Sequence, residues 1–434
     1  MDGSMNHKYA ATWESQGLRE FASQTPFKGA TQHWQDKALS FFIEEGYPGR
    51  HVEAWRYTDL TSLLAQSFSS THATPPNVSA IDLSNYKVED SYRLVFIDGA
   101  YCLEQSTVPE SVSVLAIAEL LAMEDETILR EFRIELDPPY FACLNSALMR
   151  QGCYIKIKPN SILDKPLHIL HVATHALPSA MYHPRFFIDA DKNSEITLLE
   201  EHVGPGQSIY FNNVVTQINL NFDSRVTYFK FQRESEQAYH FATTIASLSA
   251  HSQLHYYMIA DGALLNRDEV FIRHYERGSQ ANLVGFYNAK AQRQTFQHAR
   301  VDHFKRQCST YQSYKGMARD ESKAVFDSKM VVHPGANQCS VHQSNHNLLL
   351  SKDAEIDTKP NLEVYTDDIT ASHGATVGQL DEMALFYLQS RGIDAQQARH
   401  MLMSGFVNSI FEEMPNNTVT AYLRREFLGE FKDG

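Results

Sequence analysis

The segment that decides the fold is "NSEITLL", from Asn193 to Leu199: a polar turn, a small residue, then alternating apolar positions. The small residue returns at 194, 224, 252, 279, 322 and 354, so the steps are 30, 28, 27, 43 and 32 residues. A repeat of this length, made only of strands and turns, predicts a solenoid. The later copies begin "DSRVTYF" at Asp223, "HSQLHYY" at His251, "GSQANLV" at Gly278, "ESKAVFD" at Glu321 and "DAEIDTK" at Asp353.

Alternation within each copy directs one face of the strand inward, and a single turn cannot bury that face alone. We therefore expect a mainly β protein with a right-handed parallel β-helix core over residues 150–372. The step of 43 contains "QHARVDHFKRQCS" from Gln297, interpreted as a loop or a wider turn. An antiparallel sandwich is the alternative, but it does not require the small residue to return in register.

The flanking regions have helical patterns. Residues 1–135 predict a helical region with a short hairpin turning at Asp98 and Gly99, and residues 375–434 predict a second helical region. In the latter, Asp394 suits an N-cap with Gln397 as its capping-box partner. Because unpaired strand edges promote aggregation, we expect the two helical regions to cap the ends of the β-helix.

The composition is that of a globular protein: 434 residues, 43% hydrophobic and 21% charged, with a net charge of −14. Such an acidic balance disfavours nucleic acid and anionic membrane surfaces as partners. The first residues are polar, without the apolar run of a signal peptide. Five scattered cysteines indicate reduced thiols. These features predict a cytoplasmic protein.

Familiar catalytic motifs are missing from the sequence, including GxGxxG, GxxxxGK[ST], GxSxG and HExxH. Asp367 and Asp368 are adjacent, which favours turn chemistry over an acid/base pair. His342 and His346 share a strand face and form either a metal pair or, as favoured here, a polar ladder. A third group has ligand-like separations, but its first two members face opposite ways on a strand: His168, His171 and His175.

His373 stands between Ser372 and Gly374, just past the last repeat. Exposed positions at the end of a rigid scaffold often carry function, and a neutral imidazole is a good iron ligand. One imidazole does not hold a metal, so a second chain or another region would have to supply further ligands. The alternative is an ordinary surface histidine.

Two motifs resemble the SufB/SufD family of the SUF iron–sulfur cluster assembly system. They are "HVEAWRYTDLTSL" from His51 and "DTKPNLEVYTDDITASHGATVGQLDEMALFYLQSRGI" from Asp357. The SufB type carries Glu before and after the matching histidine, whereas this chain has Ser372 and Gly374, as in the SufD type. Some relatives have Cys two residues before that histidine. Ala371 stands there in this chain, so no thiol is available at that position.

The resemblance implies a non-catalytic scaffold subunit that pairs with a SufB-type paralogue through the β-helix ends. It places an interface ligand at His373, facing a cysteine of the paralogue, with a role in iron entry and nascent cluster formation. A transient iron or iron–sulfur cluster is expected in the complex, and none is expected to be held by the chain alone. A homodimer is expected when the chain is isolated.

The resemblance also places a SufC-type ATPase on residues 375–434. Candidate contacts are Phe386, Tyr387, Arg391 and Met401, although packing within a helix pair would equally explain Phe386. Two rival functions stay open. A β-helix carbohydrate-active enzyme would need paired carboxylates along the turns, and a structural protein would self-associate through its solenoid edges.

Overall fold

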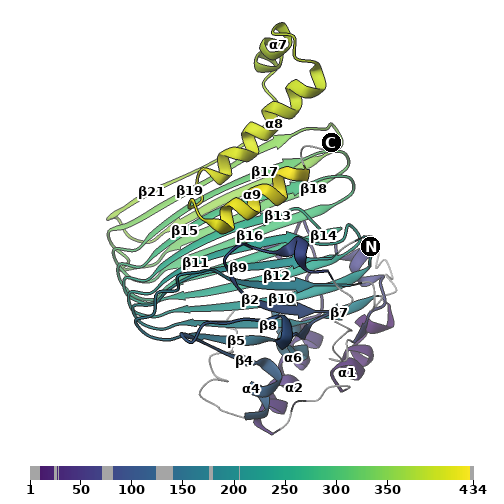
Figure 1. Cartoon of the computed structure of the whole chain (residues 1–434), viewed down its shortest axis with the longest axis vertical. Coiled ribbons are helices and arrows are strands. Elements are labelled where there is room, and N and C mark those ends of the chain that lie inside the picture. Colours follow the sequence, from purple (N-terminus) through teal and green to yellow (C-terminus); the bar gives the residue numbers. More distant parts are fainter. Residues whose placement is uncertain are drawn as a thin grey trace.

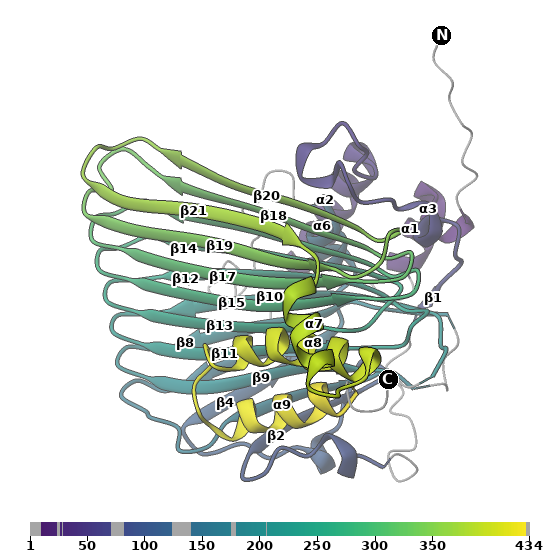
Figure 2. The same cartoon turned by 90° about the horizontal axis from the view of Figure 1, so that it is seen from above.

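The computed structural model describes residues 10–23, 27, 29–70, 82–123, 140–174, 179–204 and 206–430. Two parallel sheets face each other and are joined strand by strand into a flattened solenoid (Figures 1 and 2). Seven turns, each with one strand in either sheet, run from β8–β9 to β20–β21. The prediction of a mainly β solenoid flanked by helices is confirmed.

Sheet A contains the even-numbered strands of these turns, in the spatial order in which they follow along the chain. They are β8 (Pro184–Ala190), β10 (Tyr210–Leu220), β12 (Tyr239–Leu248), β14 (Leu265–His274), β16 (Gln294–His303), β18 (Lys323–Val332) and β20 (Glu355–Val364).

Sheet B contains the odd-numbered strands, which pair in the same parallel manner. They are β9 (Glu195–Val203), β11 (Arg225–Arg233), β13 (Gln253–Ala260), β15 (Gln280–Ala289), β17 (Ser309–Ala318), β19 (Cys339–Leu349) and β21 (Ile369–Gly378). Apolar side chains from both sheets fill the space between them.

The repeated small residue occupies the corner that leads into sheet B. At four successive corners a buried serine hydroxyl donates to the carbonyl three residues earlier, as from Ser224 to Asn221 at 2.8 Å. The residue before it has a positive φ, for example 54° at Asp223. The register extends the column through Ser194, Ser224, Ser252, Ser279, Cys308 and Cys339.

The step of 43 residues in the sequence pattern is wrong as a description of the solenoid. Ser322 and Ala354 precede β18 and β20, so they belong to corners of sheet A and not to the serine column of sheet B. Within sheet B the next corners are Cys308 and Cys339, which gives steps of 29 and 31 residues after Ser279. The segment interpreted as a loop or wider turn is largely the regular strand β16.

The first end of the solenoid is closed by short strands from the N-terminal region. β4 (Val112–Ala116) pairs antiparallel with β5 (Gln151–Ile157) at the edge of sheet A. In sheet B, β6 (Leu167–Val172) is followed by β2 (Tyr92–Ile97) and β3 (Ala100–Tyr101). β2 and β3 form the predicted hairpin, and both turn residues, Asp98 and Gly99, have positive φ. The strand β1 (Ser69–Ser70) pairs with β7 (Ala180–Tyr182) beside sheet A.

N-terminal helices cover the outer face of sheet A. An aromatic cluster joins them to the strands, with Trp55, Phe141 and Phe241 in mutual contact and Trp13 against Phe211. Residues 124–135 of the expected N-terminal region lie outside the described residues. The helices are α1 (Ser15–Ser23), α2 (Ala30–Glu45), α3 (Thr61–Leu64), α4 (Ile117–Met123) and α6 (Tyr140–Leu148).

C-terminal helices flank the solenoid on its other side. The second half of α8 (Ala395–Phe411) and all of α9 (Thr418–Glu430) lie on the outer face of sheet B, where Phe427 contacts Phe286. α7 (Glu382–Ser390) extends away from the strands (Figure 1). These helices therefore do not cap the last turn, because their apolar faces are buried against the side of sheet B. Within the described ranges, every helix is too short or too polar to cross a membrane.

Candidate functional site at the open end of the solenoid

The last turn of the solenoid is open. Within the part of the chain that the structure describes, β20 pairs only with β18 and β21 only with β19, so each strand presents one unpaired backbone edge. None of the residues in these two strands is buried, in contrast to the preceding turns. Exposed apolar side chains at this end include Val364, Tyr365 and Val377. Two strands of ten residues with free edges form a surface suited to pairing with another chain.

His373 lies in the middle of β21 and belongs to the inward-facing column of sheet B. The register aligns it with Gln343, which is aligned in turn with Gln312 and Leu283. Those three residues are buried inside the solenoid, whereas His373 is exposed. Its imidazole is therefore inward-facing in register yet accessible, because among the described residues no further turn is stacked on β21.

Polar side chains lie inside the solenoid next to its open last turn. Gln343 donates to Gln312 at 3.0 Å, and Ser328 of sheet A donates to the same amide oxygen at 2.7 Å. Next along β19, the amide oxygen of Asn345 accepts from Thr358 of β20 at 2.8 Å. In the column of His373, earlier turns place Leu198, Tyr228, Tyr256 and Leu283 where the last turns place Gln312 and Gln343. The interior thus becomes polar as it approaches the open end.

The outer face beside His373 carries the ladder predicted for His342 and His346. His342 shares a 2.7 Å hydrogen bond with Ser372, and His346 shares one of 2.9 Å with Thr376. Both histidines are exposed on the same face of β19. His373 points to the opposite face of the sheet. It is also within a strand, not beyond the last one, since β21 runs to Gly378 and crosses the expected boundary at 372.

The other sequence candidates lie elsewhere. His168 faces outward and pairs with Glu201 at 2.8 Å, while His171 faces inward and stacks on His202, which confirms that they occupy opposite faces. His175 lies outside the described residues. Asp367 and Asp368 are exposed in the connection between β20 and β21, as expected of turn residues.

The second candidate surface is the projecting part of the C-terminal region. Phe386 is 67% exposed, Tyr387 57% and Met401 46%, although all three are large apolar or aromatic side chains. Arg391 is also exposed and its guanidinium lies 5.2 Å from the centre of the Tyr387 ring. Packing within the helix pair therefore does not bury Phe386. Met383, 74% exposed, belongs to the same surface and was missed, although it lies three residues before Phe386 on one helix.

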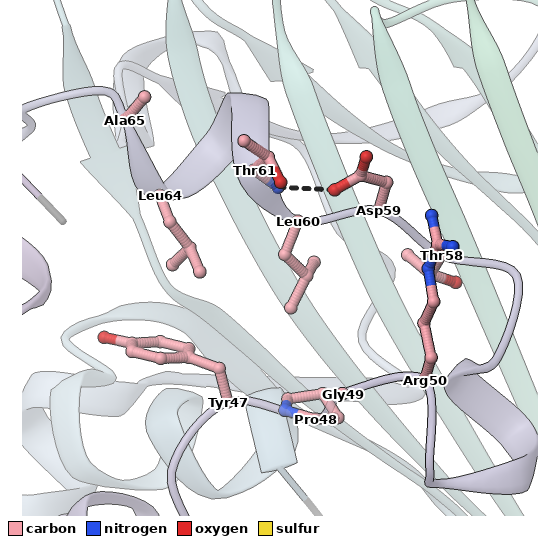
Figure 3. Close-up of a pocket in the computed structure, with 10 residues that line it drawn as sticks. All are labelled: Tyr47, Pro48, Gly49, Arg50, Thr58, Asp59, Leu60, Thr61, Leu64 and Ala65. Atoms are coloured by element: carbon pink, nitrogen blue, oxygen red, sulfur yellow. Dashed lines mark hydrogen bonds between the residues drawn. The ribbon is translucent and has the colours of Figure 1, made fainter. Parts of the chain in front are cut away.

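A pocket in the N-terminal region has a volume of about 310 Å³ (Figure 3). Its walls come from Tyr47–Arg50, Thr58–Thr61, Leu64 and Ala65, and Asp59 accepts a hydrogen bond from the backbone of Thr61 at 2.9 Å. This bond holds the turn that leads into the short helix α3, so the carboxylate has a structural partner.

Charged groups also gather inside the solenoid, where the sequence pattern alone did not place them. Glu200 pairs with His202 at 2.8 Å, and Glu234 pairs with His240 at 2.5 Å. Burial alone would raise the pKa of Glu234, but the paired His240 outweighs it and holds the pKa at about 2. Both carboxylates therefore have partners inside the solenoid and are inaccessible to a polymeric substrate.

The fold and this open end define a class of protein: a helix-flanked β-solenoid whose last turn is bare. Residues 171–406 match the family described as "SUF system FeS cluster assembly, SufBD core domain", and residues 19–169 match the "SufBD protein N-terminal region". The chain belongs to the SufBD family of the SUF iron–sulfur cluster assembly system.

Several curated relatives are similar over most of this chain. An iron–sulfur cluster assembly SufBD family protein of Synechocystis is 28% identical over 392 residues, covering 87% of this chain and 86% of the relative. The iron–sulfur cluster assembly protein SufD of Escherichia coli is 29% identical, covering 89% and 88%. Protein ABCI7, chloroplastic, of Arabidopsis thaliana is 26% identical, covering 96% and 89%.

Proposed function

We propose that this chain is a non-catalytic scaffold subunit of the SUF system that pairs with a SufB-type paralogue and a SufC-type ATPase. The observation that carries the proposal is the bare last turn, with an accessible imidazole in an otherwise buried inward column. Iron, or a nascent iron–sulfur cluster, is the cargo handled at that end in the complex.

Pairing with the paralogue is supported by the free edges of β20 and β21. An added strand would satisfy their unpaired N–H and C=O groups and would cover the apolar side chains of Val364, Tyr365 and Val377. A paralogue with the same solenoid would present matching strands. The same geometry supports a homodimer when the chain is isolated.

The proposed role of His373 follows from its position in that junction. Once a second solenoid packs on the last turn, the imidazole lies between the two chains. The polar side chains of Gln343 and Asn345, on the preceding strand β19, lie next to it on the side of this chain. A single neutral imidazole offers one nitrogen ligand, so the paralogue supplies the remaining ligands, including a thiolate. Ala371 contributes none.

The ATPase contact is supported by the projecting surface of α7 and the first half of α8. Large apolar side chains left exposed on neighbouring helices, such as Phe386 and Met401, are typical of a protein interaction site. α8 has 17 residues and is therefore about 25 Å long, with Val407, Ile410 and Phe411 buried against sheet B at its far end. A rigid helix anchored in this way would transmit motion of the ATPase to the solenoid.

A carbohydrate-active enzyme is the weaker reading. Glycoside hydrolysis by paired carboxylates needs both groups open to the substrate. Here Glu200 and Glu201 are fully buried; Glu200 is paired with His202, and Glu201 with His168 and Arg233. The proposal of a non-catalytic role rests on this occupation of the acidic groups.

The test is co-expression of His373→Ala with the ATPase and the paralogue, followed by pull-down and assay of iron and sulfide. We expect an intact complex with cluster content reduced at least tenfold, since a ligand is lost while the edges remain. His342→Ala is the matched control, because that exposed imidazole lies on the neighbouring strand and the outer face. Normal cluster content in His373→Ala overturns the ligand role, and failure of the wild-type chain to capture the paralogue overturns the scaffold role.

A further inference from the structure

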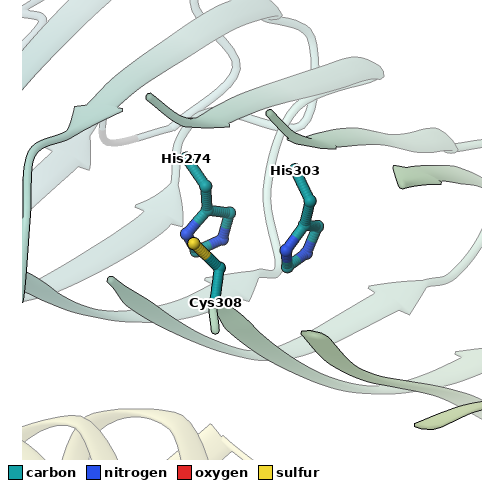
Figure 4. A group of neighbouring side chains, drawn as sticks. All are labelled: His274, His303 and Cys308. Atoms are coloured by element: carbon teal, nitrogen blue, oxygen red, sulfur yellow. The ribbon is translucent and has the colours of Figure 1, made fainter. Parts of the chain in front are cut away.

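A second concentration of metal-binding side chains lies at the corner between β16 and β17, away from the open mouth. It consists of His274 at the end of β14, His303 at the end of β16 and Cys308 just before β17 (Figure 4). Their ligand atoms all lie within 4.8 Å of one another, and all three residues are buried. The thiol of Cys339 lies at the same corner one turn later and donates to the carbonyl of Lys305 at 3.4 Å.

The repeat itself shows that these residues are unusual. The corner column contains Ser194, Ser224, Ser252 and Ser279, then changes to Cys308 and Cys339. The last residues of five successive strands of sheet A are aligned in register. They are Leu220, Leu248, His274, His303 and Val332. Two imidazoles replace aliphatic side chains at the corner where thiols replace hydroxyls. Neither change improves packing, since serine and leucine already satisfy these positions in other turns.

The two imidazoles are oriented by one hydroxyl. The Nε2 atom of His274 lies 3.0 Å from Oγ1 of Thr310, and Nε2 of His303 lies 2.9 Å from the same oxygen. His303 can donate Nε2–H to this oxygen and keep a free electron pair on Nδ1. His274 would do the same on binding an ion, once its Nδ1 exchanges the contact with Ser279 for the metal. The remote nitrogen of a metal-bound histidine usually donates to a carboxylate, a backbone carbonyl or water, and here the hydroxyl of Thr310 would take that place.

One nitrogen of the group lacks a partner. Nδ1 of His303 is buried and makes no hydrogen bond in this structure, whereas Nδ1 of His274 contacts Ser279 at 2.8 Å. Leaving a buried imidazole nitrogen unpaired costs free energy unless something else binds it.

We propose that His274, His303, Cys308 and Cys339 bind one thiophilic divalent transition-metal ion of the zinc or ferrous type. Two imidazoles and two thiolates form a common tetrahedral ligand set for such ions. Binding replaces the two S–H bonds by two metal–sulfur bonds and releases both protons to solvent, with no change of oxidation state. The ion would link two successive corners of sheet B, that of Cys339 one turn before the last turn and that of Cys308 two turns before it.

This inference stands apart from the proposed function and departs from the expectation that the chain holds no metal by itself. Its role is structural: it ties β14, β16, β17 and β19 together beneath the last turn. The exposed turn residues Lys305, Arg306 and Gln307 lie directly beside Cys308, so the corner is close to solvent and an ion has a short route inward.

The test uses the full-length chain, purified anaerobically with a thiol reductant and without added metal. Elemental analysis should find about one zinc or iron ion per chain. Cobalt(II) added to the metal-stripped chain should give thiolate-to-cobalt charge-transfer bands and the d–d bands of tetrahedral coordination. Re-addition of zinc should raise the melting temperature.

The variants are chosen so that the fold survives. Cys308→Ser and Cys339→Ser restore the residue that other turns carry, and His303→Leu restores the aliphatic column. Each should lower the metal content at least tenfold and remove the charge-transfer bands, whereas the control Cys143→Ser should change neither. Retention of metal and bands in all three site variants would overturn the proposal. So would absence of bound metal from the wild-type chain, or a Cys308–Cys339 disulfide in the reduced preparation.

Discussion

The two ends of the solenoid differ in the length, pairing and burial of their edge strands. At the first end, sheet A stops at the five-residue β4 and sheet B at the two-residue β3, and both are joined antiparallel to their neighbours. The inner residues at this end, Leu94 and Phe96 of β2 and Val112 of β4, are buried. At the last end, β20 and β21 are each ten residues long, and neither strand contains a buried residue.

This contrast separates stability from association. A solenoid must hide its edges to stay soluble, and short strands achieve this at the first end. The last end keeps long, regular edges and a polar interior, which is costly for an isolated chain but suited to a partner with the same architecture. The predictions below therefore compare covered positions with open ones.

The largest expected difference lies within one inward column. Leu283→Ala should lower the free energy of unfolding by about 2–5 kcal/mol, because it leaves a cavity between the sheets. His373→Ala, three turns further along the same column, should change it by less than about 0.5 kcal/mol, because the site is open. Denaturant titration of both variants measures this. Equal destabilisation by the two substitutions would show that the last turn is packed like the others.

The covered side also predicts a pH dependence. His183 is fully enclosed beneath the N-terminal helices, and burial lowers its pKa to about 3, well below that of an unfolded chain. The unfolded state therefore binds the extra proton first, so stability should fall as pH decreases from 6.5 towards 3. The share of His183 is at most about 1.4 kcal/mol per pH unit. In His183→Gln the slope should be shallower over this window, measured by denaturant titration at several pH values. Parallel profiles for variant and wild type would contradict it.

The open edge predicts a change in association without loss of fold. The double substitution Tyr365→Lys and Val377→Lys places charges at two exposed positions of the last turn. Charged edges resist strand pairing, so affinity for the paralogue should fall about tenfold, or about 1.4 kcal/mol, with the melting temperature unchanged. Isothermal titration with the paralogue gives the affinity. The exposed Phe222→Lys, at a corner far from that end, is the control and should bind normally.

The smallest effect concerns the projecting helix α7. Asp381 is its N-cap and accepts from the backbone N–H of Met383 at 2.8 Å. Asp381→Ala should destabilise this helix by about 1 kcal/mol and speed amide exchange there about fivefold, with no change in the solenoid. Exchange mass spectrometry resolves the two regions. Faster exchange throughout sheet B would mean that α7 supports the solenoid instead of standing apart from it.

Much of the fold could be predicted from the sequence, since corner residues such as Ser224 recur because the bend requires them. The register could not be followed past Ser279, because cysteine replaces serine at the next two corners and a similar serine, Ser322, lies in the opposite sheet. The position of the C-terminal helices was also beyond the pattern. An apolar stripe such as Val407–Ile410 shows that a helix is buried, but not which surface buries it.

The candidate site was located by a motif, and its geometry required coordinates. Sequence spacing put His373 after the last strand, whereas the structure puts it within β21 and in register with Gln343. Exposure of Phe386 and Met401 could not be decided in advance, because an amphipathic helix looks the same against its own chain and against a partner. The thiol–imidazole corner needed the register of both sheets, since its residues come from four strands or corners.

Hydrogen exchange of the chain alone and bound to the paralogue tests the central claim most directly, because it reports backbone pairing at both ends in one experiment. We expect the amides of β20 and β21 to become at least tenfold more protected on binding, while β3 and β4 stay unchanged. Protection at the first end, or none at β20 and β21, would contradict the assignment of the open turn as the docking surface.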